Sequence, residues 1–177
     1  MYFIFIALIV FLDQFIKYLI QDNISLNHTI PIIDGIFHLT YIQNSGAAFS
    51  IFQNQTKLLI FLPLIVTIIV LAFIIKKRKT EHWTILLSLS LIAAGGIGNL
   101  IDRITYGYVV DFFDFRVFPI FNVADISVSV GCGLLLIYMF FIESRFVKEK
   151  SVNMVSRVNA NDITNKLGKI NNGRKYL

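Results

Sequence analysis

The sequence predicts an all-α membrane protein, in which four transmembrane helices carry a small extracytoplasmic β-sheet or loop cradle. Composition is the first reason: 56% of the 177 residues are hydrophobic and 15% are charged, whereas soluble domains carry about 25% charged residues. The second reason is that three uncharged apolar runs approach the roughly 20 residues that cross a bilayer. The third is an extended segment with a turn signal between the first two spans.

The four spans are predicted at about residues 2–20, 58–75, 83–101 and 123–142. Only Asp13 and Lys17 interrupt the first span, and their spacing of four places them on one helix face, where most such pairs are structural. No basic residue precedes this span and no small-x-small cleavage site follows it, so we interpret it as a retained helix. Residues 1–147 then form the four-span domain, and the Asn-rich segment 148–177 is expected to be a disordered cytoplasmic tail.

The distribution of basic residues predicts the orientation. Short loops rich in Lys and Arg stay in the cytoplasm. Twelve of the sixteen basic residues lie in the loop after the second span or in the segment from Glu143 onward. Both termini are therefore predicted to be cytoplasmic, with residues 21–57 and 102–125 outside. This topology and attraction to anionic lipid account for the net charge of +5, so no nucleic-acid partner is expected.

The first outer loop has an extended pattern. Apolar residues flank Asp34-Gly35, which is a hairpin signal, and residues 37–44 alternate between two faces. We expect an outer β-cradle over about residues 30–56. It continues into residues 44–52, where Phe49, Ile51 and Phe52 are placed to dip into the membrane interface. This segment is either a lid or cradle over the acids of the second outer loop or an ordinary surface loop.

The third and fourth spans contain small residues that allow helices to approach closely. Gly95, Gly96 and Gly98 lie in the third span, and Gly131 and Gly133 lie in the fourth. We expect these two helices to touch. The glycines of the third helix also leave room for a substrate backbone or an acyl chain.

Four acids stand in or beside the second outer loop: Asp102, Asp111, Asp114 and Asp125. An ionised side chain at the edge of hydrocarbon is costly, so such acids usually have a partner or a task. Asp111 lies between Val110 and Phe112, where loss of solvation favours its neutral form.

Two of these acids also have a purely structural interpretation. Asn122 and Asp125 have the spacing of a capping box at the start of the fourth helix. For Asp102, the alternative is a local ion pair with Arg103 at the end of the third helix.

Paired carboxyl groups suggest hydrolysis. When two of them share one proton in a dry site, one takes a proton from water and the other polarises the scissile carbonyl, without a metal or a nucleophilic side chain. No Ser-His-Asp or HExxH pattern is present. Spacing alone does not choose among Asp102, Asp111 and Asp114 as the partner of Asp125.

Three other hypotheses stay open. Asp111 and Asp114, three residues apart, would suit Mg²⁺ or Mn²⁺ in a metal-dependent lipid phosphotransferase. A non-enzymatic four-helix transporter would line an ion path with the acids. A Ser–Lys dyad would combine Ser45 or Ser50 with Lys17 or Lys57.

Five segments resemble the successive motifs of the bacterial lipoprotein signal peptidases, also called signal peptidase II. They are DQFIK at 13–17, NSGAAF at 44–49, GGIGNLIDR at 95–103, VVDF at 109–112 and FNVAD at 121–125. The motifs occur in order over about residues 2–145, and together they are far more specific than any one of them.

This resemblance implies a membrane aspartic endopeptidase that removes the signal peptide of diacylglyceryl-modified prolipoproteins, cutting immediately before the lipid-modified cysteine. It implies Asp111 and Asp125 as the catalytic dyad. It gives supporting roles, in positioning substrate or bracing the dyad, to Asp13, Lys17, Asn44, Gly95, Asn99, Arg103 and Asn122. No metal and no cofactor are expected. The expected partners are prolipoprotein substrates and membrane lipids, for a monomer in the bacterial cytoplasmic membrane with its active site at the outer face.

Overall fold

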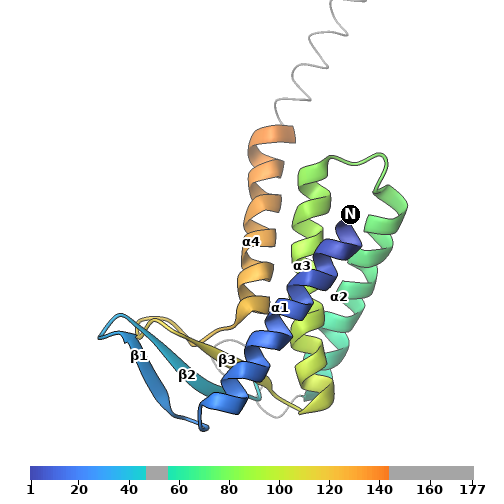
Figure 1. The fold of residues 1–177 in the computed structure, drawn as a ribbon. Helices are drawn as coiled ribbons and strands as arrows, with labels where there is room; N and C mark the ends of the chain where they lie inside the picture. The colour runs from blue at the N-terminus through green and yellow to red at the C-terminus, as the bar shows by residue number, and fades with distance from the viewer. Residues whose placement is uncertain (47–55, 144–177) are drawn as a thin grey trace, which may run out of the picture. The chain divides into compact units, whose positions relative to one another are not determined.

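The computed structural model describes residues 1–46 and 56–143, which form four helices and a small sheet (Figure 1). The elements are α1 (Tyr2–Asn23), β1 (Thr29–Ile33), β2 (Phe37–Asn44), α2 (Thr56–Lys77), α3 (Trp83–Thr105), β3 (Val109–Asp114) and α4 (Val123–Ile137). Residues Met1–Leu135 form one compact unit. The described part of a second unit, which starts at Leu136, is the end of α4 and a π-helical turn at Tyr138–Glu143. The predicted tail at 148–177 and residues 47–52 of the predicted lid or cradle segment lie outside the described residues.

Helices α1, α2 and α3 are long and apolar enough to cross a membrane, and so is α4 together with the π-helical residues that follow it, over Val123–Phe141. In α2 no charged residue lies between Lys57 and Lys76, and Phe61, Ile65 and Ile69 are exposed. A helix that is apolar all round is typical of a membrane span. The predicted class, four spanning helices with a small sheet, is confirmed.

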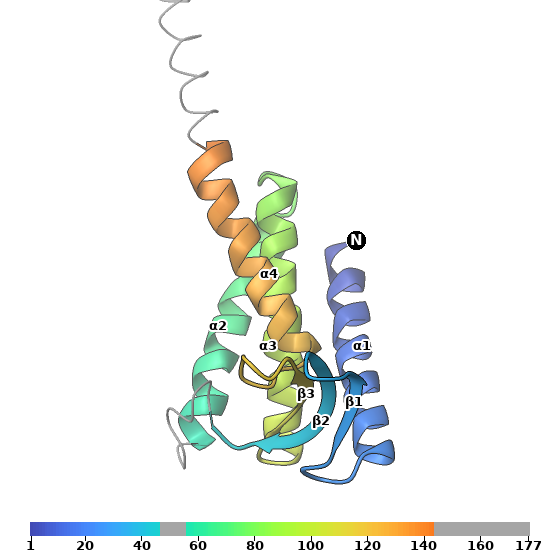
Figure 2. The same ribbon diagram turned by 90° about the vertical axis from the view of Figure 1, so that its left-hand side faces the viewer.

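Helix α3 lies between α1 and α2 (Figure 2). Ile6 of α1, Ile74 of α2 and Leu86 and Ala93 of α3 are buried together in one apolar core. Half of the spanning window of α3 is buried, against about a fifth for the other helices. Side chains of α3 are therefore the ones best placed to build a site inside the protein.

Glycines bring α3 and α4 into contact, as the sequence predicts. Gly95 of α3 faces the backbone carbonyl of Ala124 and the side chain of Val128, and Gly131 of α4 faces the carbonyl of Ser88. A Cβ atom on either glycine would come closer to these atoms than real contacts allow. The small residues thus set how near the start of α4 lies to α3.

The strands form an antiparallel sheet in the order β1-β2-β3. The predicted Asp34-Gly35 turn joins β1 to β2. Gly35 has a φ of +70°, in the left-handed region that glycine adopts without strain. The hairpin expected from the sequence is therefore present.

Strand β3 was not predicted, because the outer sheet was expected only within about residues 30–56. It pairs with β2, with Asp111 opposite Ile42. Its Val and Phe residues favour strands, and Val110 and Phe112 are fully buried. The third strand is what places Asp111 next to the helices.

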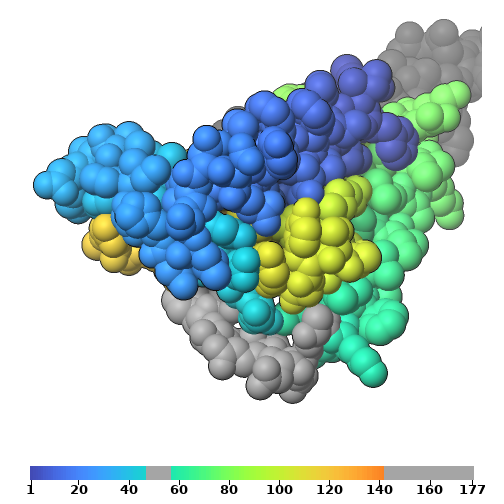
Figure 3. All heavy atoms as spheres, turned by 60° about the horizontal axis from the view of Figure 1, so that its bottom comes forward, coloured from blue at the N-terminus to red at the C-terminus, as the bar shows by residue number. Residues whose placement is uncertain are grey.

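The sheet lies at the end of the helices where α1 and α3 finish and α4 begins (Figure 1). Ile20 and Ile24 of α1 pack with Tyr41 of β2 and with Val110 and Phe112 of β3 in a second apolar core. Figure 3 shows β1 and β2, in blue to cyan, along the ends of α1 and α3. Several elements distant in sequence therefore meet at this end.

Candidate active site

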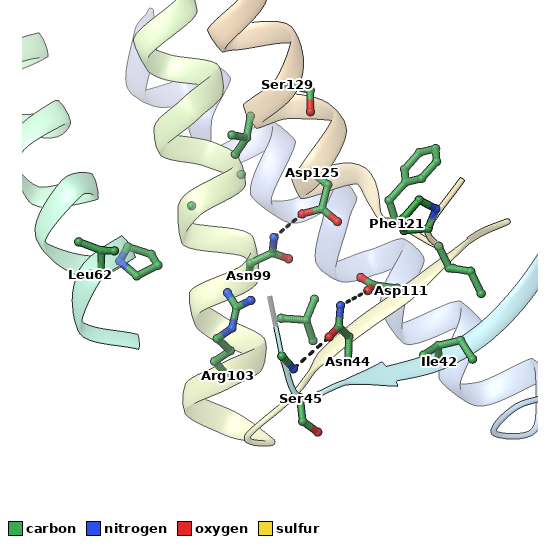
Figure 4. Close-up of a pocket in the computed structure, with 18 of the residues that line it drawn as sticks. Ile42, Asn44, Ser45, Leu62, Asn99, Arg103, Asp111, Phe121, Asp125 and Ser129 are labelled. Carbon is green, nitrogen blue, oxygen red and sulfur yellow. Dashed lines mark hydrogen bonds between the residues drawn. The ribbon is translucent and has the colours of Figure 1, made fainter. Parts of the chain in front are cut away.

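A pocket of ≈ 1080 Å³ opens at this end, bounded by α2, α3, α4 and the two strands β2 and β3 (Figure 4). Its wall is mostly apolar with a few converging polar groups, which is typical of a binding site. The polar side chains that line it include Asn44, Ser45, Thr67, Asn99, Arg103, Asp111, Asp125 and Ser129.

Two carboxyl groups enter the pocket from different elements (Figure 4). Asp111 belongs to β3, and Asp125 to the first turn of α4. Asp111 is 3% exposed, and its strand neighbours Val110 and Phe112 are fully buried. The fold thus brings together the two acids that the motif resemblance singled out.

Asn122 links these carboxyl groups. Its Nδ2 donates a hydrogen bond to Asp111 Oδ1 at 2.7 Å, and its Oδ1 accepts one from the backbone N of Asp125 at 2.9 Å. Asp125 Oδ2 accepts in return from the backbone N of Asn122 at 3.2 Å. The predicted capping box between Asn122 and Asp125 is present. Asn122 also holds the Asp111 carboxyl group, so the structural and the functional interpretations of these residues are compatible.

Asn99 holds the second carboxyl group from α3. Its Nδ2 donates to Asp125 Oδ1 at 2.8 Å, while its Oδ1 accepts from Lys17 Nζ and from Asn122 Nδ2, both at 3.1 Å. Because an ammonium only donates, the amide oxygen must face Lys17 and the amide nitrogen must face Asp125. The orientation of Asn99 is therefore fixed.

Burial raises the pKa of Asp111 to about 7. Loss of solvation is the largest cause. The hydrogen bonds from Asn44 and Asn122 favour the ionised form and oppose the shift, whereas the nearby charge of Asp125 adds to it. Asn44 Nδ2 donates to Asp111 Oδ2 at 2.9 Å. Asp111 therefore keeps its proton up to near neutral pH.

Lys17 is at the centre of a buried charge cluster. Its Nζ lies 2.9 Å from Asp13 Oδ2, 2.8 Å from Asp102 Oδ2 and 3.1 Å from Asn99 Oδ1. The expectation that Asp102 pairs with Arg103 is wrong. Adjacent side chains on a helix point in different directions, so Asp102 faces α1 whereas Arg103 lines the pocket.

The two carboxylates of this cluster also bind backbone at the pocket. Asp13 Oδ1 accepts from the backbone N of Ala124 at 2.8 Å, and Asp102 Oδ2 accepts from the backbone N of Val110 at 3.0 Å. In each case the donor is the residue immediately before a pocket acid. The cluster therefore ties both acid-bearing elements to α1 and α3.

Gln14 and Asp102 belong to this network and were not predicted as site residues. Gln14 Nε2 donates to Asp102 Oδ1 at 2.9 Å, to the carbonyl of Gly98 at 3.1 Å and to Asp13 Oδ2 at 3.2 Å. The sequence did contain an indication for Gln14: it is a polar residue in an otherwise apolar span, beside Asp13 and three residues before Lys17.

The other predicted residues of α3 lie on one face of the helix. Gly95, Asn99 and Arg103 are each four residues apart, a spacing that places them one above the other. All three line the pocket, with the Arg103 guanidinium near Asn99 (Figure 4). Within residues 1–46 and 56–143, Arg103 forms no ion pair within 4 Å, which leaves its donors directed at the pocket.

Asp114 does not join the pocket acids. It follows Asp111 by three residues on the same strand, so its side chain lies on the opposite face. There it accepts from Thr40 Oγ1 at 2.8 Å and pairs with Arg116 at 3.4 Å. The two carboxylates weighed for a divalent metal thus have different surroundings, and no group of three His, Cys, Asp or Glu side chains suited to a metal occurs among the described residues.

For a Ser–Lys dyad, Ser45 is the candidate serine that can be located, since Ser50 lies outside the described residues. Ser45 lines the pocket. The Lys17 ammonium, however, is directed at two carboxylates and the Asn99 amide rather than at a serine hydroxyl.

The fold and the site define a multi-pass membrane protein whose pocket holds two carboxyl groups. Each of these carboxyl groups accepts a hydrogen bond from the same residue, Asn122. Residues 5–141 match the family model of signal peptidase II. The lipoprotein signal peptidase of Halothermothrix orenii is 44% identical over 140 residues, which cover 79% of this chain and 95% of that protein. The corresponding protein of Streptococcus thermophilus is 48% identical over 131 residues, covering 73% and 85%.

Two solved structures of bacterial membrane enzymes are also similar. Their TM-scores are 0.76 and 0.72, each at 30% identity, and the matches cover 81% and 79% of this chain and 90% and 92% of theirs. The chain therefore belongs to the signal peptidase II family and is a membrane peptidase. The resemblance drawn from five motifs is confirmed.

Proposed function

We propose that this protein removes the signal peptide of diacylglyceryl-modified prolipoproteins, cutting immediately before the lipid-modified cysteine. The observation that carries the proposal is that Asp111 and Asp125 share one pocket and are joined through Asn122. The relatives named lipoprotein signal peptidase support the choice of substrate. The mostly apolar pocket wall beside spanning helices suits a peptide that carries lipid.

In the proposed mechanism the two carboxyl groups share one proton. Asp111, whose pKa is raised to about 7, holds the proton below that pH and gives it to the scissile carbonyl oxygen. Asp125 takes a proton from the attacking water, whose oxygen bonds to the carbonyl carbon. The intermediate is then a gem-diol. It collapses as Asp125 gives its proton to the amide nitrogen, the C–N bond breaks and the Asp111 carboxylate takes back a proton from one hydroxyl of the gem-diol, which leaves a free amine, a carboxylic acid and the dyad with its one proton.

The remaining predicted residues have supporting roles in this proposal. Asn99 and Asn44 hold the two carboxyl groups in place, and Arg103 offers donors to the substrate backbone at the pocket wall. Gly95, which has no side chain, lets the start of α4 lie directly against α3. Asp13 and Lys17 brace the dyad through the buried charge cluster.

We further propose that a single chain acts at the outer face of the bacterial cytoplasmic membrane, with both termini in the cytoplasm. The pocket and the sheet lie at one end of the helices, whereas the basic loop that joins α2 to α3 lies at the other end (Figure 1). The positive-inside tendency of short loops supports this orientation.

Asp111→Asn and Asp125→Asn test the dyad, because Asn keeps the shape of the side chain and removes its acid–base function. With a purified full-length enzyme and a diacylglyceryl-modified prolipoprotein, each change should lower kcat by at least about 10³-fold. Asp22→Asn is the matched control, since Asp22 is an exposed acid at the end of α1. Normal cleavage by either dyad variant contradicts the proposal.

A parallel assay with a chelator distinguishes catalysis by the two carboxyl groups from catalysis by a bound metal ion. Cleavage by two carboxyl groups should be unaffected by EDTA. Loss of activity in EDTA that Mg²⁺ or Mn²⁺ restores would favour the metal-dependent alternative. Ion flux across sealed vesicles without any cleavage would favour the transporter.

A further inference from the structure

The connection from β3 to α4 forms one wall of the pocket. Residues 118–121 line it. The Phe121 ring lies 5.6 Å, 5.9 Å and 5.8 Å, between ring centroids, from the rings of Phe113, Phe115 and Phe118. The backbone of Phe121 is bound to that of Phe113 in both directions, at 2.8 Å and 3.2 Å. The position of this wall therefore depends on how the chain turns as it leaves β3.

Arg116 makes that turn in an unfavourable conformation. Its φ is +65°, in the left-handed region that residues with a Cβ atom seldom adopt. Three contacts hold it there: its backbone N donates to Asp114 Oδ1 at 2.9 Å, its guanidinium lies 3.4 Å from Asp114 Oδ2, and its Nε donates to His38 Nδ1 at 3.0 Å. Such a conformation persists only when its surroundings enforce it.

The residues that hold Arg116 are themselves anchored in the sheet. His38 pairs with Asp114 across β2 and β3, and both are buried. Thr40 Oγ1 donates to Asp114 Oδ2 at 2.8 Å and lies 3.0 Å from Thr29 Oγ1, so the chain of contacts crosses all three strands. Burial opposes ionisation of Asp114, but the hydrogen bonds from Arg116 and Thr40 lower its pKa below the usual value. We call Arg116, Asp114 and His38 the Arg116 clamp.

The clamp is separate from the two pocket acids. None of its three residues is among those that line the pocket. Asn122, which follows the pocket wall, is held independently by Asn99 and by Asp111. Loosening the clamp should therefore move the wall at residues 118–121 more than it moves the carboxyl groups.

We propose that Arg116 is a positioning residue, which acts through Asp114 and His38 to fix the 118–121 wall and thereby controls how tightly the peptide substrate binds. The inference rests on the proposed function for its substrate. It goes beyond that function because it places a determinant of substrate affinity outside the motifs and outside the pocket.

The test is a comparison of KM and kcat in the purified full-length enzyme with a diacylglyceryl-modified prolipoprotein in micelles. Arg116→Ala should raise KM by about tenfold and leave kcat within about twofold, because a misplaced wall weakens binding while the dyad stays intact. Arg116→Gly should raise KM at least as much, since glycine frees the turn. An Arg116→Gly variant with the KM of the wild type would contradict the proposal, because it would show that the contacts of the Arg116 side chain do not affect substrate binding.

Two variants of His38 provide a matched pair. His38→Ala removes the acceptor for Arg116 Nε and should raise KM. His38→Asn places a side-chain oxygen, Oδ1, at the position of the His38 Nδ1 acceptor and should keep KM near that of the wild type. Val117→Ala is the control in the same connection, because Val117 is 94% exposed and does not line the pocket.

Amide hydrogen exchange provides a second readout. In Arg116→Ala the Phe121 amide should exchange faster while the amides of α3 stay protected. If all amides of Arg116→Ala lose their protection from exchange, that variant is unfolded. The KM of the milder variant His38→Ala then tests the proposal in its place. If KM is unchanged in the variants that remain folded, or if only kcat falls, Arg116 does not control substrate binding and this inference is overturned. Cleavage by the wild type would still support the proposed function in that case. Absence of cleavage by the wild type overturns both.

Discussion

Lys17 of α1 and Asp102 of α3 form an ion pair of 2.8 Å, in which the two side chains are 3% and 1% exposed. The same carboxylate accepts from the backbone of Val110, next to Asp111. A buried charge without a partner is costly. Lys17 supplies the counter-charge for Asp102, and Asp13 is the second carboxylate beside the same ammonium. The pair therefore connects the stability of the helices to the position of a pocket acid.

Replacing Lys17 with Met should lower the free energy of unfolding by about 3–5 kcal/mol, because two buried carboxylates lose their counter-charge. Unfolding in detergent, followed by circular dichroism, measures this loss. Lys77→Met is the control, since the Lys77–Glu81 pair is 41% and 28% exposed and should contribute at most about 1 kcal/mol. Adding Asp102→Asn to Lys17→Met should recover part of the loss. Equal effects of the two lysine changes would show that the cluster does not brace the fold.

Most of the features that the sequence predicted correctly depend on residues close together in the chain; the contact between α3 and α4, predicted from their small residues, is the exception. The spans follow from apolar runs, the hairpin from Asp34-Gly35, and the capping box from the spacing of Asn122 and Asp125. Strand β3 was missed because its partner lies far away, in β2. A six-residue segment with four apolar residues and two aspartates, lying between two helices, does not by itself indicate which strand it joins.

The choice among the acids could not be made from spacing for a similar reason. Asp102, Asp111 and Asp114 look equivalent along the chain, but the fold directs them to α1, to the pocket and to the far face of the sheet. A local ion pair with Arg103 was one interpretation of Asp102, because the two residues are neighbours in the chain. Its actual partner, Lys17, is on another helix.

Asn122→Ser should separate the two roles of Asn122. Serine still caps a helix, so the loss of stability should be limited to about 1–3 kcal/mol, which comes from the buried acceptors that lose the Asn122 Nδ2 donor. Its side chain is too short to replace the 2.7 Å donor to Asp111, so kcat should fall by about 10²-fold. Kinetics and thermal unfolding of the purified variant test both parts. Wild-type kinetics would mean that Asn122 is only a cap.

The rate should decline above about pH 7, because the proposed acid Asp111 then loses its proton. Asn44 donates to the ionised form, so Asn44→Ala should raise the pKa of Asp111 further and shift the alkaline limb of kcat/KM upward. The profile is measured from about pH 5 to about pH 9. Asn23→Ala, at the exposed end of α1, is the control. If the alkaline limb of kcat/KM moved to lower pH in Asn44→Ala, or did not move, a group other than Asp111 would be responsible for that limb.

Gly95→Ala should disturb the site from within the helix contact. The added Cβ would overlap the carbonyl oxygen of Ala124 and lie 2.7 Å from Val128 Cγ2. Helix α4 then has to move away from α3 and takes Asp125 away from Asn99, so cleavage should fall by about 10- to 100-fold and stability by about 1–3 kcal/mol.

Gly133→Ala is the matched change on α4, since no described atom outside the local chain lies within 4 Å of its added Cβ. It should preserve the rate, and the higher helix propensity of alanine should leave stability unchanged or raise it by up to about 1 kcal/mol. Both variants are compared by kinetics and by unfolding in detergent. If the two glycine changes had the same effect, helix propensity rather than the α3–α4 contact would account for it, and the position of Asp125 would not depend on the absence of a side chain at Gly95.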